Sequence, residues 1–137
     1  MAIVVDASSA IAWIMPDERH ASHAPLLRRI GDEGAIVPGL WPIEVANVLL
    51  FAERRRRISA ADRVEALRFL NELPIEIDSE TAAQAWGATL GLAERFRLTL
   101  YDAAYLELAQ RRGLPLASLD RDLRKAGRAL GLDVLGA

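Results

Sequence analysis

Short runs rich in apolar residues alternate with longer stretches of helical periodicity along this chain. The short runs lie between turn residues and predict strands. The predicted strands cover residues 3–5, 35–37, 75–77, 114–119 and 133–135. The longer stretches repeat apolar side chains at spacings of three and four, which predicts helices. The predicted helices cover residues 9–15, 18–31, 42–57, 60–73, 79–95, 100–112 and 120–130.

Several helix boundaries carry their own signals. Pro42 suits a first helical position, and Ser59 with Asp62 approaches a capping box. Gly113 is a typical C-terminal stop. Strands that alternate with helices predict a parallel sheet joined by right-handed crossovers, two of which hold a pair of helices. We therefore expect an α/β fold with four to five parallel strands.

Composition narrows the class of protein. The chain has 137 residues and no internal repeat, so we expect a single domain over residues 1–137, and 52% hydrophobic residues supply its core. The absence of cysteine excludes disulfides, thiolate zinc sites and catalytic thiols. The N-terminal apolar run has no basic lead and meets Asp6 at once, and no stretch is apolar enough to span a bilayer. We expect a cytoplasmic protein.

Two acids follow predicted strands. Asp6 comes directly after residues 3–5, and Asp120 ends the run 116–120. Sites in open α/β sheets form at the carboxyl ends of the strands, which favours a functional role for both. Capping of the next helix is an equally simple explanation for each residue taken alone.

Two more acids stand in the first turns of predicted helices. Glu44 lies close to Pro42, and Asp102 shares a helical face with Tyr105 and Leu106. The helix dipole alone could explain an acid at either position. An ionised carboxylate among apolar neighbours is nevertheless costly unless it is paired or binds a metal, and this argument is strongest for Asp102.

Together, Asp6, Glu44, Asp102 and Asp120 can meet at one edge of a parallel sheet. A cluster of acids needs a counter-charge, and oxygen-only ligands favour Mg²⁺ or Mn²⁺. Such an ion polarises phosphoryl groups and activates water. The only histidines are His20 and His23, and no phosphate-binding glycine loop is present, so serine-type hydrolysis and nucleotide-loop chemistry are disfavoured.

The order of these motifs resembles the PIN-domain nucleases, specifically the VapC-type toxins of prokaryotic toxin–antitoxin pairs. The resemblance rests on four segments, residues 4–10, 44–49, 98–106 and 116–120. Ser118 departs from the family, which often has threonine there, but it keeps a hydroxyl. The resemblance implies a three-layer α/β/α fold, Mg²⁺- or Mn²⁺-dependent cleavage of RNA, a homodimer, and inhibition by a cognate antitoxin of a type II pair.

The predicted roles follow from this combination. Asp6 and Asp102 are expected to bind metal directly, while Glu44 and Asp120 complete the set or hold water. Ser8, Asn47 and Ser118 are candidates for orienting these groups. Four successive arginines could contact RNA phosphates, although a solvated helix end explains them as well. They are Arg54, Arg55, Arg56 and Arg57.

Two other functions remain open on the sequence alone. One is a Mg²⁺-dependent aspartyl-phosphate phosphotransfer domain. Such a hydrolase has a second acid where this chain has Ser8, and a receiver domain has a lysine near its last strand, whereas Lys125 lies within the last predicted helix. The other is a PIN-like binding module without catalysis. A protein partner is expected to cover apolar side chains of the early helices, because one small core may leave them exposed. These side chains are Trp13, Leu26, Leu27 and Phe51.

Overall fold

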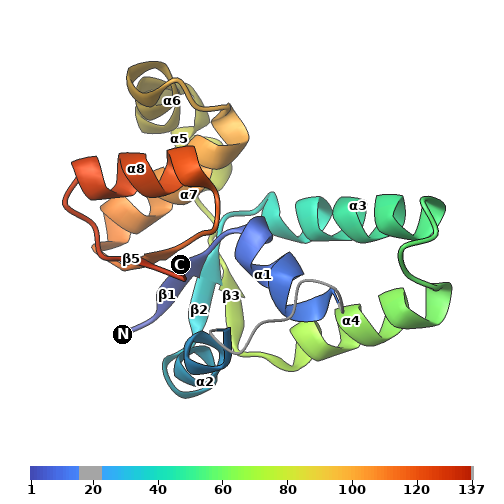
Figure 1. Ribbon diagram of the computed structural model, residues 1–137. Coiled ribbons are helices and arrows are strands. Elements are labelled where there is room, and N and C mark those ends of the chain that lie inside the picture. Colours follow the sequence, from blue (N-terminus) through green and yellow to red (C-terminus); the bar gives the residue numbers. More distant parts are fainter. Residues whose placement is uncertain (16–22, 137) are drawn as a thin grey trace.

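A five-stranded parallel sheet forms the centre of the computed structural model, which describes residues 1–15 and 23–136. The strand order is β3-β2-β1-β4-β5 (Figure 1). The strands are β1 (Ile3–Val5), β2 (Ala35–Val37), β3 (Ile75–Ile77), β4 (Leu116–Ala117) and β5 (Val134–Leu135). The predicted number and parallel direction of the strands are confirmed, and β5 lies at an edge as expected.

Helices cover both faces of this sheet, which gives the expected three-layer α/β/α fold. Figure 1 shows α1, α3 and α4 on one side and α6, α7 and α8 on the other. The helical segments are α1 (Ala7–Ile14), α2 (His23–Glu33), α3 (Trp41–Arg54), α4 (Ala60–Glu72), α5 (Thr81–Gln84), η1 (Ala85–Thr89), α6 (Leu90–Phe96), α7 (Leu100–Arg112) and α8 (Arg121–Ala129). The strands β1 and β2 are fully buried between these layers, as parallel strands usually are.

The connections run in two directions from β1. The helix pairs α1–α2 and α3–α4 lead to β2 and then to β3, whereas the later helices lead to β4 and β5 on the other side of β1. The two predicted crossovers with paired helices are thereby confirmed. The direction reverses between β1 and β4, and such a switch point is where open α/β sheets bind ligands at the carboxyl ends of their strands.

One predicted helix is interrupted in the structure. Residues 79–95 were expected to form a single helix with Trp86 on its packed face. The segment instead comprises α5, the π-helical turn η1 and α6, and Gly87 adopts a non-helical backbone (φ −109°, ψ −106°). A π turn adds a residue to the helical repeat. Trp86 lies within this turn and is 92% exposed, whereas Thr89 and Ala93 further along are buried.

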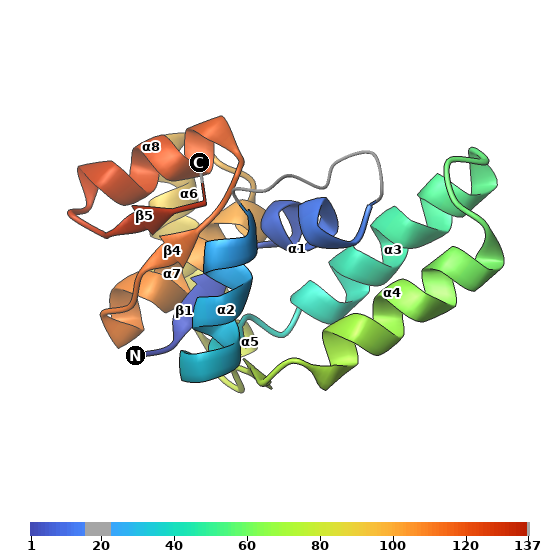
Figure 2. The same ribbon diagram turned by 60° about the horizontal axis from the view of Figure 1, so that its bottom comes forward.

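The pair α3–α4 forms an arm that projects from the sheet, and Figure 2 shows the two helices running side by side. Ser59 and Asp62 form the predicted capping box at the start of α4. The turn before it contains Arg56 in a left-handed conformation (φ 62°), which reverses the chain direction. Only Leu70 of α4 is buried, so most of this helix faces outward.

The early part of the chain corrects two expectations. The predicted helix 18–31 begins at His23 in the structure, and residues 18–22, with His20, lie outside the described residues. Trp13 and Leu26 were expected on an uncovered surface, but both are buried in the core. None of the helices within the described residues is long and apolar enough to cross a membrane.

Candidate active site

The four acids predicted from the sequence lie around one cavity at the switch point between β1 and β4. Asp6 directly follows β1, and its N–H donates to the carbonyl of Ala117 in β4 (3.1 Å). Glu44 and Asp102 come from the first turns of α3 and α7, and Asp120 precedes α8. The cavity has a volume of about 470 Å³. Its lining residues are Asp6, Ala7, Ser8, Ile11, Glu44, Val48, Arg57, Asp102, Tyr105, Leu119 and Asp120.

Asp6 is the most buried and most firmly held of these acids. It is 4% exposed. Its carboxylate accepts hydrogen bonds from the Ser118 hydroxyl (2.6 Å), the Ser8 hydroxyl (2.7 and 2.9 Å) and the Ser9 N–H (3.0 Å). The last bond makes Asp6 the N-cap of α1. The capping interpretation of Asp6 therefore applies, and the hydroxyls of Ser8 and Ser118 also hold its carboxylate.

Asp120 also combines a cap with a place in the cavity. Its carboxylate accepts from the Leu123 N–H (2.8 Å) and begins α8. Its own N–H donates to the Ser118 hydroxyl (3.0 Å). Ser118 is fully buried and thus connects the two strand-end acids, Asp6 and Asp120.

Glu44 and Asp102 reach the cavity from opposite faces of the sheet. Thr99 caps α7 by accepting a hydrogen bond from the Asp102 N–H (3.1 Å), and Asp102 lines the cavity. Glu44 accepts a hydrogen bond from the hydroxyl of Tyr105 (2.8 Å). Tyr105 was seen in the sequence only as an apolar neighbour of Asp102, three residues earlier on α7. That spacing was the signal that could have placed it in the site.

Burial and mutual repulsion raise the pKa values of three of these acids. Burial raises the pKa of Asp6, and this effect exceeds the lowering by its three hydrogen bonds. Burial also raises the pKa of Glu44 despite the bond from Tyr105, and the charges of Asp102 and Asp6 add to it. The pKa of Asp102 is raised by burial first and then by Asp120 and Asp6. The acids therefore interact as one negatively charged group.

The part of the chain that the structure describes provides no ion pair to neutralise this group. Within residues 1–15 and 23–136, no lysine or arginine forms an ion pair with any of the four carboxylates. The oxygen-only donors suit a hard divalent cation. In the same residues, no three His, Cys, Asp or Glu side chains are already grouped closely enough to hold a metal ion. A cation would therefore have to draw the carboxylates toward one another.

Some of the other predicted site residues line the acidic cavity and some do not. Arg57 lines the acidic cavity, and it follows α3 at the tip of the arm. Arg54 and Arg55 instead lie over the ring of Phe51, at 5.7 and 6.0 Å from its centroid. Asn47 is exposed and lines a neighbouring hollow with Phe51 and Arg55. Of these predicted residues, only Arg57 is brought to the four acids.

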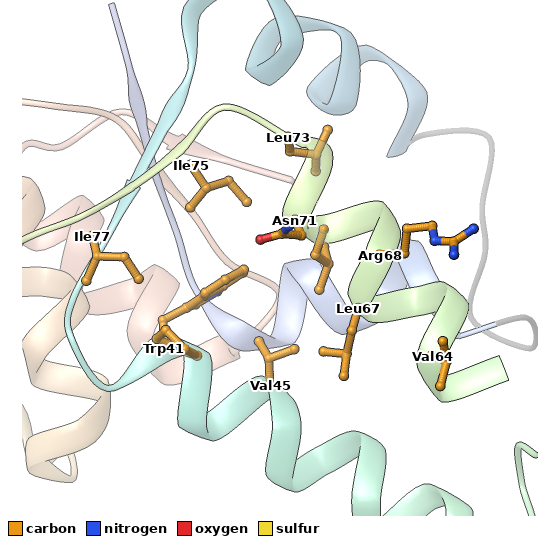
Figure 3. A pocket seen from close by; sticks show the side chains of 11 residues that line it. Trp41, Val45, Val64, Leu67, Arg68, Asn71, Leu73, Ile75 and Ile77 are labelled. Atoms are coloured by element: carbon orange, nitrogen blue, oxygen red, sulfur yellow. The ribbon is translucent and has the colours of Figure 1, made fainter. Parts of the chain in front are cut away.

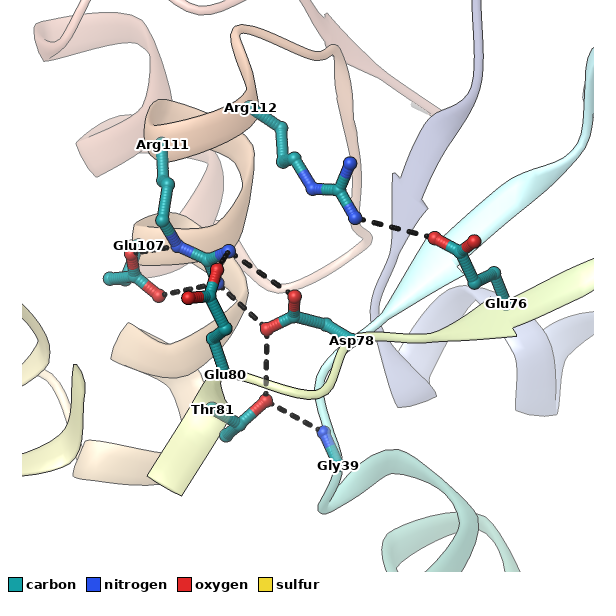
Figure 4. A network of polar contacts seen from close by, with 8 residues as sticks. All are labelled: Gly39, Glu76, Asp78, Glu80, Thr81, Glu107, Arg111 and Arg112. Carbon is teal, nitrogen blue, oxygen red and sulfur yellow. Dashed lines mark hydrogen bonds and ion pairs between the residues drawn. The ribbon is translucent and has the colours of Figure 1, made fainter. Parts of the chain in front are cut away.

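A second acidic cluster lies away from this cavity and has its own cation. The guanidinium of Arg111 donates to Glu107 (2.8 and 3.1 Å), to Asp78 (2.7 and 3.2 Å) and to Glu80 (3.1 Å) (Figure 4). Asp78 also accepts from the Thr81 hydroxyl, which in turn accepts from the Gly39 N–H (2.8 Å) just before α3. This network ties α7 to the ends of β2 and β3.

Comparisons with known proteins assign the family. The model of the PIN domain matches residues 3–129, and the chain belongs to the PIN-domain family. The chain is 33% identical to Ribonuclease VapC3 of Pyrobaculum aerophilum over 134 residues, which cover 95% of this chain and 98% of that protein. It is 31% identical to Ribonuclease VapC9 of Mycobacterium tuberculosis over 132 residues, covering 93% and 92% of the two chains.

A solved structure supports the fold independently. The chain superposes on a crystal structure of VapBC2 from Rickettsia felis bound to a DNA fragment from its promoter, with a TM-score of 0.72. The match covers 100% of this chain and 99% of that chain at 13% sequence identity. At this identity the likeness concerns the fold alone.

Proposed function

We propose that this protein is a metal-dependent endoribonuclease and the toxin of a type II toxin–antitoxin pair. The observation that carries the proposal is the group of four carboxylates around one cavity, without an ion pair from any described lysine or arginine. The relatives named VapC ribonucleases, which match almost the whole chain, support the same activity.

The four acids and Arg57 then each have a defined part in the reaction. A bound Mg²⁺ or Mn²⁺ would polarise a phosphoryl oxygen of the RNA and lower the pKa of water. Asp6, held by Ser8 and Ser118, and Asp102 would bind the ion directly. Glu44 and Asp120 would complete the set or accept a proton from water. Arg57 would contact a phosphate of the RNA, because guanidinium forms paired hydrogen bonds with phosphate oxygens.

A phosphotransfer function has less support. An aspartyl-phosphate domain of the receiver type needs a lysine near its acids, and Lys125 is exposed on α8 and does not line the cavity. Both oxygens of the best candidate nucleophile, Asp6, already accept hydrogen bonds from serine hydroxyls.

RNA cleavage by the purified chain tests the proposal directly. Single-stranded RNA should be cut with Mg²⁺ or Mn²⁺ and left intact with excess chelator. Loss of a residue that only orients a metal ligand typically lowers activity about 10–100-fold. Asp6→Asn and Asp102→Asn should each lower activity by more than this. Asp32→Asn, an exposed acid on α2 that does not line the cavity, is the control and should retain activity. Full activity of the wild type in chelator would disprove the mechanism.

We further propose that an antitoxin binds the outer side of the α3–α4 arm. An apolar groove of about 750 Å³ lies there, between the two helices and the edge strand β3 (Figure 3). Val64 and Leu67 on α4 and Ile77 on β3 line it and are each at least 36% exposed. Trp41 also lines this groove, and its buried indole N–H has no acceptor among the described residues.

Two further parts of the proposal concern assembly. The Rickettsia relative was solved as a VapBC pair, which supports a protein partner for this chain. We propose that the toxin itself acts as a homodimer in the cytoplasm. Light scattering of the isolated chain should give twice the 15.0 kDa mass, and purification from its native operon should recover the antitoxin.

A further inference from the structure

Tyr105 connects the core of the protein to one of the site acids. Its ring is 1% exposed, and its hydroxyl donates to Oε1 of Glu44 across 61 positions of sequence. Asp102 lies three residues earlier on the same helix, and residues at this spacing are neighbours on a helix surface. A single helix, α7, thus carries one site acid and the anchor of another.

The bond restricts a side chain that is otherwise flexible. A glutamate has three rotatable bonds, and Glu44 has no other hydrogen-bond partner among the described residues. Tyrosine has only two, and both are fixed here because the ring is packed in the core. The hydroxyl donates one hydrogen bond, to Oε1, so Oε2 stays available to a ligand in the cavity.

We propose that Tyr105 is a positioning residue, whose hydroxyl holds the Glu44 carboxylate toward the acidic cavity so that it binds a divalent cation together with Asp102. The inference rests on the proposed metal-dependent function. It assigns to α7 the task of setting the relative position of two metal-binding groups that come from opposite faces of the sheet. Groups that orient a metal ligand in this way strengthen metal binding without touching the metal.

A purely structural role for Tyr105 makes a different prediction. If the residue only fills the core, Tyr105→Phe keeps the ring and leaves cation binding unchanged. If it positions Glu44, the variant stays folded in chelator but binds the cation more weakly. The chain provides a matched control, because its only other tyrosine, Tyr101, lies on the same helix and is 65% exposed.

The experiment is a calorimetric titration of the full chain with Mn²⁺, followed by RNA cleavage at increasing Mn²⁺. Tyr105→Phe should bind Mn²⁺ about 10–100-fold more weakly than the wild type, and Tyr101→Phe should bind it equally well. Cleavage by Tyr105→Phe should recover its maximal rate at raised Mn²⁺. A folded Tyr105→Phe that binds Mn²⁺ as tightly as the wild type would overturn the inference alone. A wild type that binds no Mn²⁺ would overturn the proposed function as well.

A second measurement covers the case in which Tyr105→Phe does not fold. In Tyr101→Phe, Tyr105 is the only tyrosine. Labelling tyrosine with ¹³C at Cζ, the ring carbon that bears the hydroxyl, therefore gives a single NMR signal. This signal should move as Mg²⁺ is added and saturate with the Mg²⁺ affinity measured by calorimetry. A signal that stays in place at saturating Mg²⁺ would overturn the inference.

Discussion

Two clusters of acids within the described residues differ in their counter-charge. Around Arg111, the carboxylates of Asp78, Glu80 and Glu107 receive all the hydrogen bonds that one guanidinium can donate. Around the cavity at the switch point, the acids receive hydrogen bonds from hydroxyl and backbone groups but no ion pair from a described cation. Within residues 1–15 and 23–136, the first cluster therefore has its own cation, whereas the second has none.

The pKa values of the two clusters show what this difference means. Hydrogen bonds from Arg111 lower the pKa of Asp78, while burial raises the pKa values of Asp6, Glu44 and Asp102. The same residue type is thus stabilised as an anion in one place and disfavoured in the other. A buried acid indicates a binding site only when the fold withholds the cation that would neutralise it.

The largest effect should come from breaking the cluster around Arg111. Arg111→Ala leaves the buried carboxylates of Asp78 and Glu107 without their cation, so the free energy of unfolding should fall by about 3–5 kcal/mol. Arg112→Ala is the control, because its ion pair with Glu76 is exposed and should be worth about 1 kcal/mol or less. Urea denaturation measures both. Equal losses in the two variants would contradict the comparison.

Removing a charge from the acids around the cavity should instead stabilise the metal-free protein. Asp102→Asn removes one repelling charge, so the metal-free variant should melt at a higher temperature than the wild type. Mn²⁺ at a hundredfold excess over its dissociation constant should stabilise the wild type by about 2.7 kcal/mol and Asp102→Asn by less. Thermal melting in chelator and in Mn²⁺ measures this, with the exposed Glu65→Gln as control. If Asp102→Asn melts at a lower temperature than the wild type in chelator, the Asp102 charge does not repel the other site acids and the prediction is wrong.

The smallest effect is a difference in pH dependence. Raised folded-state pKa values mean that the folded chain binds more protons, so the metal-free protein loses stability as pH rises above the ordinary values, 3.8 for Asp6 and Asp102 and 4.5 for Glu44. The lowered pKa of Asp78 acts oppositely, and its contribution is lost as pH falls below 3.8. Melting curves in chelator should therefore show the advantage of Asp102→Asn growing with pH. The advantage of wild type over Asp78→Asn should instead shrink in acid.

The sequence predicted most of the fold because its strongest signals are local. The apolar triplets of β1 and β2 and the capping box of α4 fall where they were expected. The helix 79–95 was wrong because periodicity averages over a window, and one non-helical residue, Gly87, is enough to interrupt the helical repeat next to the exposed Trp86. The outcome for Trp13 and Leu26 depends on which helices cover them, and this information is not local.

The site was predictable to the extent that strand ends and first helical turns determine position. Asp6 and Asp120 were placed by strand ends, and Glu44 and Asp102 by first helical turns. The cost of an ionised carboxylate among apolar neighbours and the resemblance to PIN-domain nucleases added to that argument. Asn47 was expected beside Glu44, one turn away, but the cavity continues along α3 through Val48 instead. Tyr105 was missed because a tyrosine at core spacing has the same pattern whether or not its hydroxyl reaches a polar group.

The length of α3 gives the cavity a direction. Glu44 at the base of this helix and Arg57 beyond its end line the same cavity, and the helix between Glu44 and Arg54 spans about 15 Å. The four acids stand near one end of this cavity. Under the proposed function, a polyanionic strand lying along α3 would have one phosphate at the acidic end, where a cation can accept it, and the length of the helix would set how far the strand runs along the protein from that phosphate.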